Sequence, residues 1–189
     1  MPISTLISPH QRGGLLSCRR LILLCAGIIL AFTSAAFAQS ALPNGASALQ
    51  ETYQDWRVAC NARDKAPVCT ISQDQTQQNG QRLLAVEIQM RSDGNAAATL
   101  LLPFGIVFDS GVTPTIDDQP PLKPVRFRTC LPAGCIALFP IDSPTLTKLR
   151  MSSRLNLKVT NDSDKELSFQ VSLRGFSAAL DRVVALSAR

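Results

Sequence analysis

The chain has 189 residues, of which 46% are hydrophobic and 17% charged, a composition that fits one folded domain and excludes intrinsic disorder. Its only histidine, His10, lies in a segment that we expect to be removed, which excludes Ser-His and Cys-His catalysis and histidine metal ligation in the mature protein. The formal charge of +5 comes largely from the same segment.

Residues 1–38 have the order of a Sec-type secretory signal peptide. Arginines at positions 12, 19 and 20 precede an apolar run from Leu21 to Phe32, and small residues ending in Ala36-Phe37-Ala38 follow. The apolar run of about twelve residues is shorter than the roughly twenty that span a bilayer. We therefore expect export to the periplasm or beyond, cleavage after Ala38, and no stable membrane insertion of the mature chain. An uncleaved membrane anchor is the alternative.

Removal of this leader takes away three arginines and no acidic residue, which leaves 16 basic and 14 acidic residues and a charge of +2. Without clustering, that charge gives no electrostatic case for a nucleic-acid partner. Residues 39–52 are small and polar and predict a flexible N-terminal arm. Residues 53–189 are then the folded domain.

Four cysteines remain after cleavage, and an even number in an exported chain indicates disulfides. Polar and apolar residues alternate over 54–61, and 68–73 reads as the returning strand of a hairpin. The register of this hairpin places Cys60 opposite Cys69 and Val58 opposite Ile71. Directly opposed residues in a non-hydrogen-bonded pair lie about 4.5 Å apart at Cα, within reach of a disulfide. We expect this bridge to be buried against Trp56.

A second hairpin follows the same logic. Residues 125–130 alternate, a turn covers 131–134, and 135–141 return, so that Cys130 faces Cys135 and Phe127 faces Leu138. This bridge shares a face with Arg126 and should be the more exposed of the two. A four-thiolate zinc site is the competing interpretation, but neither pair has the C-x-x-C spacing common in such sites. The sequence therefore predicts neither a metal nor a cofactor.

Further strands are predicted over 82–90, 97–102, 105–108, 112–116, 155–159 and 167–173. Asp142-Ser143-Pro144 is a helix-start signal for a short helix over 145–151. A closing helix over 176–186 would place Phe176, Leu180, Val183 and Val184 on one face. Eight or nine short strands with one or two short helices indicate an all-β sandwich.

Several short motifs in this order resemble the invasion-associated locus B (IalB) proteins. The motifs are Trp56-x-x-x-Cys60, Cys69-Thr70-Ile71, Leu102-Pro103 with Gly105, Gly111 with Ile116-Asp117, Cys130 with Gly134-Cys135, and Ser172-Leu173-Arg174-Gly175-Phe176. They run from about Gln54 to Leu186. The resemblance implies a bacterial, exported protein with an immunoglobulin-like β-sandwich. It carries over no catalytic residue, because the shared residues are cysteines, turn glycines and core aromatics.

Two groups of acidic residues are candidate sites. Asp109-Ser110-Gly111 is the short signature of retroviral-type aspartic proteases, in which two such loops share a proton. No supporting glycine-bearing apolar segment follows, so a turn with Gly111 at positive φ is the better interpretation. Asp109, Asp117 and Asp118 could bind calcium, but they lack a D-x-D-x-D-G loop and read as solvated turn residues.

Lys123, Arg126 and Arg128, together with Arg57, could form a basic strip for an anionic glycan or lipopolysaccharide. A solvated face or a guarded edge strand is the alternative. Trp56 shares the face of Val58 and Cys60, which predicts core packing; an exposed recognition tryptophan is the other option.

Three functions from different classes follow. The first is a non-enzymatic exported protein that binds an unidentified protein or cell-surface partner, with host interaction as one setting. The second is a carboxylate-based hydrolase, which a pocket holding two carboxylates about 5 to 9 Å apart would favour. The third is a periplasmic assembly factor that pairs an edge strand with a client.

Overall fold

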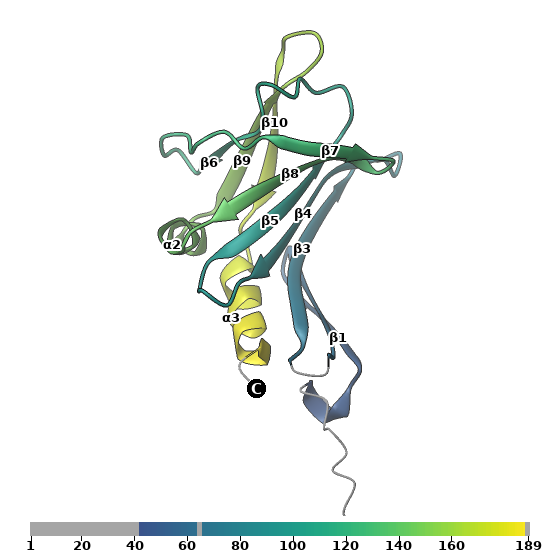
Figure 1. The fold of residues 1–189 in the computed structure, drawn as a ribbon, viewed down its shortest axis with the longest axis vertical. Coiled ribbons are helices and arrows are strands. Elements are labelled where there is room, and N and C mark those ends of the chain that lie inside the picture. Colours follow the sequence, from purple (N-terminus) through teal and green to yellow (C-terminus); the bar gives the residue numbers. More distant parts are fainter. Residues whose placement is uncertain (1–41, 64–65, 188–189) are drawn as a thin grey trace, which may run out of the picture. The chain divides into compact units, whose positions relative to one another are not determined.

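Antiparallel hairpins arrange the chain in two sheets (Figure 1). The computed structural model describes residues 42–63 and 66–187, all of which belong to one compact unit, Gln39–Arg189. The predicted signal peptide lies outside the described residues. None of the described helices is both long enough and apolar enough to span a membrane.

The larger sheet has seven strands, and its first five follow one another as a meander of hairpins. In spatial order they are β1 (Ala48–Tyr53), β2 (Trp56–Asn61), β3 (Val68–Thr76), β4 (Arg82–Met90), β5 (Ala96–Leu102), β8 (Gly134–Ile141) and β7 (Phe127–Leu131). Period-two alternation buries Leu84, Val86 and Ile88 of β4 and leaves Glu87 outside, as the sequence predicts.

The smaller sheet has three strands in the order β10 (Glu166–Ser172), β9 (Arg154–Thr160) and β6 (Thr113–Ile116). It is joined to the larger sheet by side chains. The buried side chain of Gln73 on β3 donates to the carbonyl of Ser172 at 3.0 Å and accepts from the N–H of Ser172 at 3.2 Å. The indole Nε1 of Trp56 donates to the same carbonyl at 2.9 Å.

Two α-helices form at the predicted places, and a 3-10 turn, η2 (Pro43–Gly45), precedes β1. Helix α2 (Ser143–Met151) begins where the Asp142 carboxylate accepts a hydrogen bond from the N–H of Thr145 at 2.9 Å. Helix α3 (Phe176–Ser187) packs against β1, β2 and β3. Its buried residues are Phe176, Ala179, Leu180, Val183 and Leu186. Val184 is 48% exposed, contrary to prediction, because it lies one residue and about 100° past Val183.

The flexible arm predicted over 39–52 is wrong for its last five residues, which form most of β1. Leu49, Glu51 and Tyr53 are half-buried on one face of β1 while their neighbours are exposed. An edge strand of this kind needs only one modest inward face, so a polar composition does not exclude it. Leu42, further upstream, is 2% exposed.

Three other predictions need correction. Residues 105–108 form turns with one isolated bridge, Ile106 to Asn161, because Gly105 adopts a φ of +80° and interrupts the strand. Strand β7 begins at Phe127, and a register irregularity between Phe127 and Thr129 places Phe127 opposite Ala137 and not Leu138. The described residues form ten strands, more than the eight or nine predicted.

Candidate anion-binding site

Both predicted disulfides are present. Cys60–Cys69 joins β2 to β3 and Cys130–Cys135 joins β7 to β8, with Cα–Cα distances of 4.1 and 3.9 Å. The first hairpin has the predicted register, with Val58 opposite Ile71. Both cysteines of the first bridge are buried, whereas in the second Cys135 is buried and Cys130 is exposed. The predicted difference in exposure between the two bridges is therefore confirmed. The predicted shared face of Cys130 and Arg126 is wrong, because the register shift between Phe127 and Thr129 places Cys130 on the same face as Phe127, opposite the buried residues Cys135 and Ala137.

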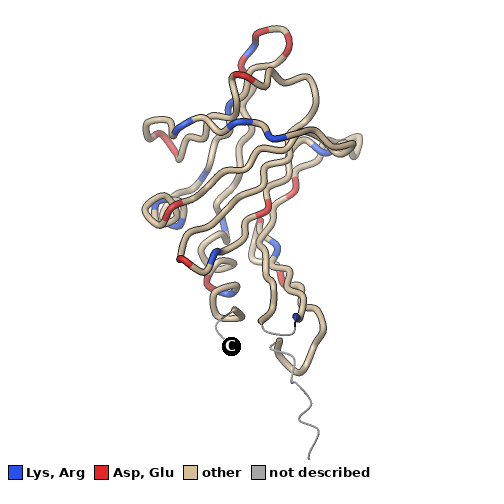
Figure 2. The backbone as a smooth tube through the Cα atoms, in the orientation of Figure 1, with Lys and Arg blue, Asp and Glu red and all other residues tan. Residues whose placement is uncertain are grey.

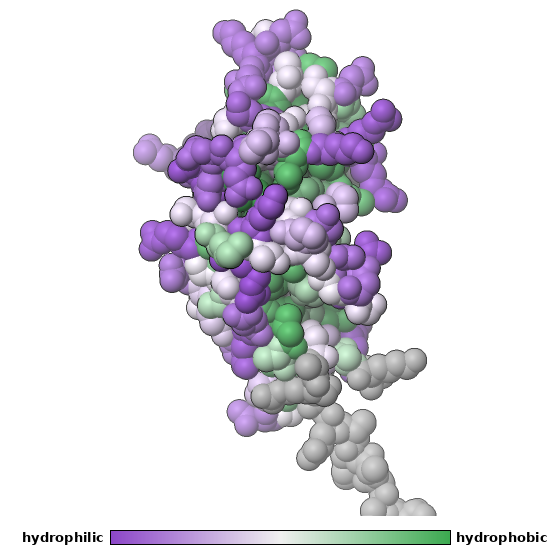
Figure 3. Space-filling model, turned by 90° about the vertical axis from the view of Figure 1, so that its left-hand side faces the viewer, coloured by the Kyte–Doolittle hydropathy of each residue, from purple (hydrophilic) through white to green (hydrophobic). Residues whose placement is uncertain are grey.

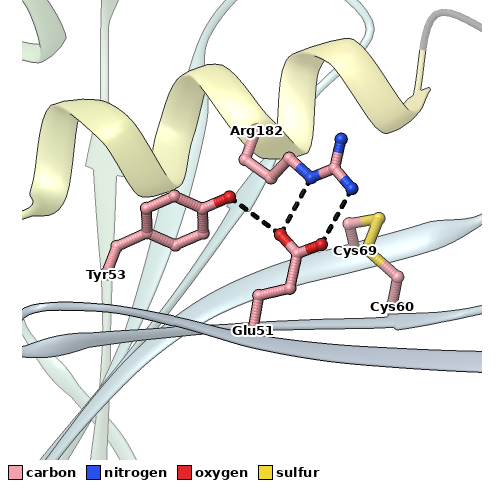
Figure 4. Close-up of a disulfide and its surroundings, with 5 residues drawn as sticks. All are labelled: Glu51, Tyr53, Cys60, Cys69 and Arg182. Carbon is pink, nitrogen blue, oxygen red and sulfur yellow. Dashed lines mark hydrogen bonds and ion pairs between the residues drawn. A yellow bond between two sulfur atoms is a disulfide. The ribbon is translucent and has the colours of Figure 1, made fainter.

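An ion pair that the sequence did not predict holds α3 against β1 beside the buried bridge (Figure 4). Arg182 donates from Nε and Nη2 to the two carboxylate oxygens of Glu51, both at 2.8 Å, and the Tyr53 hydroxyl donates to the same carboxylate at 2.8 Å. The hydrogen bond from Arg182 lowers the pKa of Glu51, and the bond to Glu51 raises the pKa of Tyr53. The partners are 131 residues apart, so no local spacing signals them.

Trp56 is 1% exposed, which excludes a recognition role at the surface. Its ring meets that of Phe176 edge-on with centroids 5.2 Å apart. Together with the hydrogen bond to Ser172, this contact makes Trp56 a core residue that ties both sheets to α3.

The acidic residues that were candidates for a protease or calcium site lie in turns or form hydrogen bonds and an ion pair with neighbouring segments. Gly111 closes the Asp109-Ser110-Gly111 turn by donating to the Phe108 carbonyl at 3.1 Å, with a φ of +65° as predicted. The Asp117 carboxylate accepts from the N–H groups of Ser153 and Arg154 at 3.1 and 3.0 Å. Burial raises the pKa of Asp117, but hydrogen bonds from residues 152–154 outweigh it and leave the pKa below its ordinary value. Asp118 pairs with Arg154 at 2.7 Å.

The basic residues of the second hairpin lie along the segment that leads into β7 and at the start of that strand. Figure 2 shows blue positions following one another there. We call Lys123, Arg126 and Arg128 the basic strip. All three are exposed, whereas Val125 is 9% exposed and Phe127 is half-buried, so the predicted alternation holds.

Arg57 does not belong to this strip. It lies on β2 and lines a separate concavity of about 500 Å³ on the outer face of the larger sheet, 3.9 Å from the Asp74 carboxylate. Arg82 lies 3.2 Å from the same carboxylate. Glu87 lines this concavity as well.

The strip borders a hollow of about 520 Å³ between β8, the start of α2 and the segment before β7. Residues that line it include Leu122, Lys123, Arg126, Leu138, Pro140 and Asp142. Leu138 is 41% exposed. Figure 3 shows this side of the protein, where hydrophobic atoms lie between hydrophilic side chains. Arg128 is not among the lining residues.

Two sets of backbone hydrogen bonds position the strip. Val112 and Val125 exchange both of their backbone hydrogen bonds at 2.8 Å, and the N–H of Leu122 donates to the Pro114 carbonyl at 2.8 Å. Gly111 allows this approach, because a Cβ at that position would lie 2.6 Å from the Val125 carbonyl oxygen. The chain on either side of Lys123 and Pro124 is thus fixed to β6.

The charges of the hollow favour an anion. Within the described residues, neither Lys123, Arg126 nor Arg128 forms an ion pair. Asp142 is the acidic residue in the wall. Its carboxylate already caps α2, and the hydrogen bond to Thr145 lowers its pKa. The site therefore combines unpaired cations at its rim with an apolar floor, which suits an anion attached to an apolar group. No group of three or more histidine, cysteine or acidic residues close enough to hold a metal occurs in the described part of the chain.

Comparisons with known proteins agree with the sequence motifs. Residues 56–184 match the family model described as invasion associated locus B (IalB) protein. An invasion protein B homologue of Brucella abortus (strain 2308) is 40% identical over 167 residues, covering 85% of this chain and 95% of that protein. Invasion protein B of Bartonella bacilliformis is 32% identical over 171 residues, covering 83% of this chain and 92% of that protein.

The structure is similar to the crystal structure of invasion associated protein B from Bartonella henselae. The TM-score is 0.70 at 30% sequence identity, and the match covers 74% of this chain and 97% of that one. Cys60, Cys69, Cys130, Cys135 and Trp56 all lie inside the region that the family model matches.

Proposed function

The chain belongs to the invasion-associated locus B family, and on that premise we propose that it is an exported, non-enzymatic protein that binds an anionic partner at the bacterial envelope through the basic strip and the hollow. The observation that carries the proposal is the set of unpaired cations beside an apolar depression. The relatives named for invasion support a cell-surface partner, including one in contact with a host.

The chemistry of the site defines the partner class. A guanidinium binds phosphate or carboxylate with two parallel hydrogen bonds, and an ammonium acts as a point charge. Lys123 and Arg126 thus supply anion recognition, while Leu122, Leu138 and Pro140 offer contact to hydrocarbon. An anionic glycolipid such as lipopolysaccharide combines both features. Anionic glycans without lipid offer the negative charge but no hydrocarbon.

Export is part of the proposal and rests on the leader-like sequence and on two disulfides, which persist in oxidising compartments. Intact-mass analysis of protein purified from periplasm should give a chain that begins at or near Gln39. A mass that retains residues 21–32 would exclude cleavage at the proposed site. The immunoglobulin-like form of the sandwich is likewise part of the proposal. The two sheets have seven and three strands, whereas antibody-type domains divide their strands more equally.

A carboxylate-based hydrolase is the rival function, and the concavity that holds Asp74 and Glu87 is where it would act. Asp74 lies 3.2 Å from Arg82 and 3.9 Å from Arg57, so its carboxylate is already engaged in ion pairs. A binding role is therefore better supported than acid-base chemistry.

Retention by two immobilised probes, lipopolysaccharide and heparin, tests the proposal on the mature chain. The double variant Lys123→Ser/Arg126→Ser should bind lipopolysaccharide at least about tenfold more weakly, because each charge-assisted hydrogen bond contributes roughly 1.5 to 3 kcal/mol. The control Arg91→Ser/Arg174→Ser removes the same charge from exposed positions outside the hollow. Equal losses in both variants, or no wild-type retention on either probe, would refute the assignment. Retention on heparin alone would identify a glycan partner.

A further inference from the structure

Strand β10 has one free edge. It pairs with β9 in an antiparallel ladder whose ends are marked by the bonds from Leu173 N–H to the Ser153 carbonyl at 3.0 Å and from Asn161 N–H to the Lys165 carbonyl at 2.9 Å. Alternate residues of such a ladder exchange bonds with the partner strand. The backbone groups of the other residues point away from β9. These residues are Glu166, Ser168, Gln170 and Ser172.

One half of this edge is closed by side chains. Gln73 satisfies both backbone groups of Ser172, Trp56 adds a bond to the Ser172 carbonyl, and Gln75 donates to the Gln170 carbonyl at 2.6 Å. All three side chains come from β2 and β3. A register irregularity in β3 between Gln75 and Thr76 marks the point beyond which this bridging stops.

The other half is open. In the part of the chain that the structure describes, the outward N–H and carbonyl groups of Ser168 and Glu166 have no hydrogen-bond partner. Beside them is an end groove of about 320 Å³, with apolar lining from Leu83, Pro103, Leu167 and Phe169. Leu167 is 37% exposed and Phe169 is half-buried, although both belong to the strand that buries Val171 further along.

We propose that this open half of β10 accepts an extended, uncharged segment of another polypeptide as an added strand, with alternate apolar side chains seated in the end groove. The unsatisfied backbone groups select an extended peptide, because an added strand is what satisfies a row of outward N–H and carbonyl groups. The lining residues select apolar side chains. The proposal concerns a second surface and does not rest on the anion site.

Charge and chain length identify the occupant further. Arg82 in the groove forms an ion pair with Asp74, and Glu166 forms one with Lys158 at 2.8 Å. The described lining of the groove therefore has no unpaired charge that would favour a charged peptide. The described chain begins at Leu42 and ends at Ser187, both at the opposite end of this unit from the start of β10 (Figure 1). Cleavage after Ala38 would leave three residues before Leu42, which span about 10 Å when extended. The proposal therefore assigns the segment to another molecule.

The probe for the test is a synthetic nine-residue peptide of alternating threonine and valine, acetylated at its N-terminus and amidated at its C-terminus so that it carries no charge. Its control has proline in place of every valine and cannot pair as a strand. Saturating probe should slow amide hydrogen exchange at Ser168 and Glu166 of the mature protein at least tenfold. The control peptide should leave both rates unchanged.

Variants separate strand pairing from unspecific binding. Ser168→Pro removes an outward N–H without breaking a bond to β9, and proline is tolerated at such edge positions. Its matched control is Thr52→Pro, at an outward position of the free edge of β1. Leu167→Asp is the second variant, which alters the groove and leaves the backbone intact.

We expect at least tenfold weaker binding for Ser168→Pro and Leu167→Asp and wild-type binding for Thr52→Pro. Absence of slowed exchange in wild type, or unchanged binding in both groove variants, would overturn the proposal. Slowed exchange at Ser168 without peptide, rising with protein concentration, would show that a second copy of the chain occupies the edge and would overturn it as well. Loss of lipopolysaccharide binding by Lys123→Ser/Arg126→Ser has no bearing on these outcomes, so the two proposals fail separately.

Discussion

Two hairpins of the larger sheet, β2–β3 and β7–β8, each contain a disulfide, but the surroundings of the two disulfides differ. Both close a short loop with a bridge between directly opposed cysteines. In the first, the strands are covered by α3, and the neighbouring strand β1 is joined to α3 by Glu51 and Arg182. In the second, β7 is the edge of the sheet, Cys130 is exposed, and basic residues precede it.

A disulfide within one hairpin therefore does not by itself reveal a role. What matters is the face on which the cysteine lies and what covers that face. Cys60 shares the inward face of Trp56 and Val58, so its bridge contributes to the core. Cys130 shares a face with its buried partner Cys135, but it is itself exposed because β7 is the edge strand of the sheet. Its bridge lies in the strand that follows the basic residues of the surface that we propose to be functional.

The largest expected effect distinguishes the two bridges directly. Loop closure alone predicts that either bridge contributes roughly 2 to 3 kcal/mol. Removing the buried sulfur atoms of Cys60 and Cys69 also leaves a cavity, so Cys60→Ala/Cys69→Ala should lower the free energy of unfolding by about 4 kcal/mol. Cys130→Ala/Cys135→Ala should cost less, about 3 kcal/mol, because only one of its two cysteines, Cys135, is buried. Urea unfolding of both variants checks this, and equal losses would contradict the comparison.

The contact between β1 and α3 can be tested by a pair of glycines with nearly the same φ. At Gly175 (φ +82°) a Cβ would lie 2.0 Å from the Tyr53 carbonyl oxygen, whereas at Gly94 (φ +80°) it would meet nothing within 4 Å. Gly94→Ala should cost about 1 kcal/mol through backbone strain alone, and Gly175→Ala about 3 kcal/mol because overpacking is added. Thermal and urea unfolding give both values. A difference near zero would show that α3 is not held closely against the end of β1.

The ion pair beside the buried bridge makes a smaller contribution that depends on pH. The folded-state pKa of Glu51 is lowered, so its stabilisation is present above the unfolded pKa of about 4.3 and is lost as pH falls through the folded value. Glu51→Gln should cost up to about 1 kcal/mol at pH 7. Its difference from wild type should shrink as the pH falls below about 4.3 and through the lowered folded-state pKa of Glu51. A difference that stays constant between pH 7 and pH 3 would contradict the assignment.

The smallest stability effect is expected on the exposed side. Arg126 and Arg128 are exposed and have no ion pair in the described residues, so Arg126→Ser/Arg128→Ser should change the free energy of unfolding by less than about 0.5 kcal/mol. Differential scanning calorimetry should show a nearly unchanged melting temperature. A loss above about 1 kcal/mol would mean that the strip contributes to the fold and is not free for a partner.

Features that depend on neighbours in the sequence were predictable. The cysteine register, the alternation in β4 and the start of α2 at Asp142 each depend on a few consecutive residues. Strand β1 was missed because a half-buried edge strand tolerates polar residues. The Glu51–Arg182 pair was missed because only the packing of α3 brings residues so far apart in the sequence together.

The basic residues of the site could be predicted from the sequence, but the hollow that they border could not. Lys123, Arg126 and Arg128 stand out as basic residues around a strand, but the hollow also requires Leu138 on β8 and Asp142 before α2. Nothing in the local sequence indicates that the bridge between Val112 and Val125 holds the segment before β7 beside the start of β6. The open half of β10 likewise depends on where the side chains from β3 stop reaching it.

We propose that the side of the protein with the exposed bridge contacts the partner, while the side with the buried bridge holds the fold together. A titration of the ¹⁵N-labelled mature protein with lipopolysaccharide, followed by amide chemical shifts, tests it most directly. We expect changes in chemical shift that are concentrated at residues 122–128 and 138–142 and absent from residues 51–60 and 176–184. Shifts centred on the second set of residues, or no shifts at saturating probe, would contradict it.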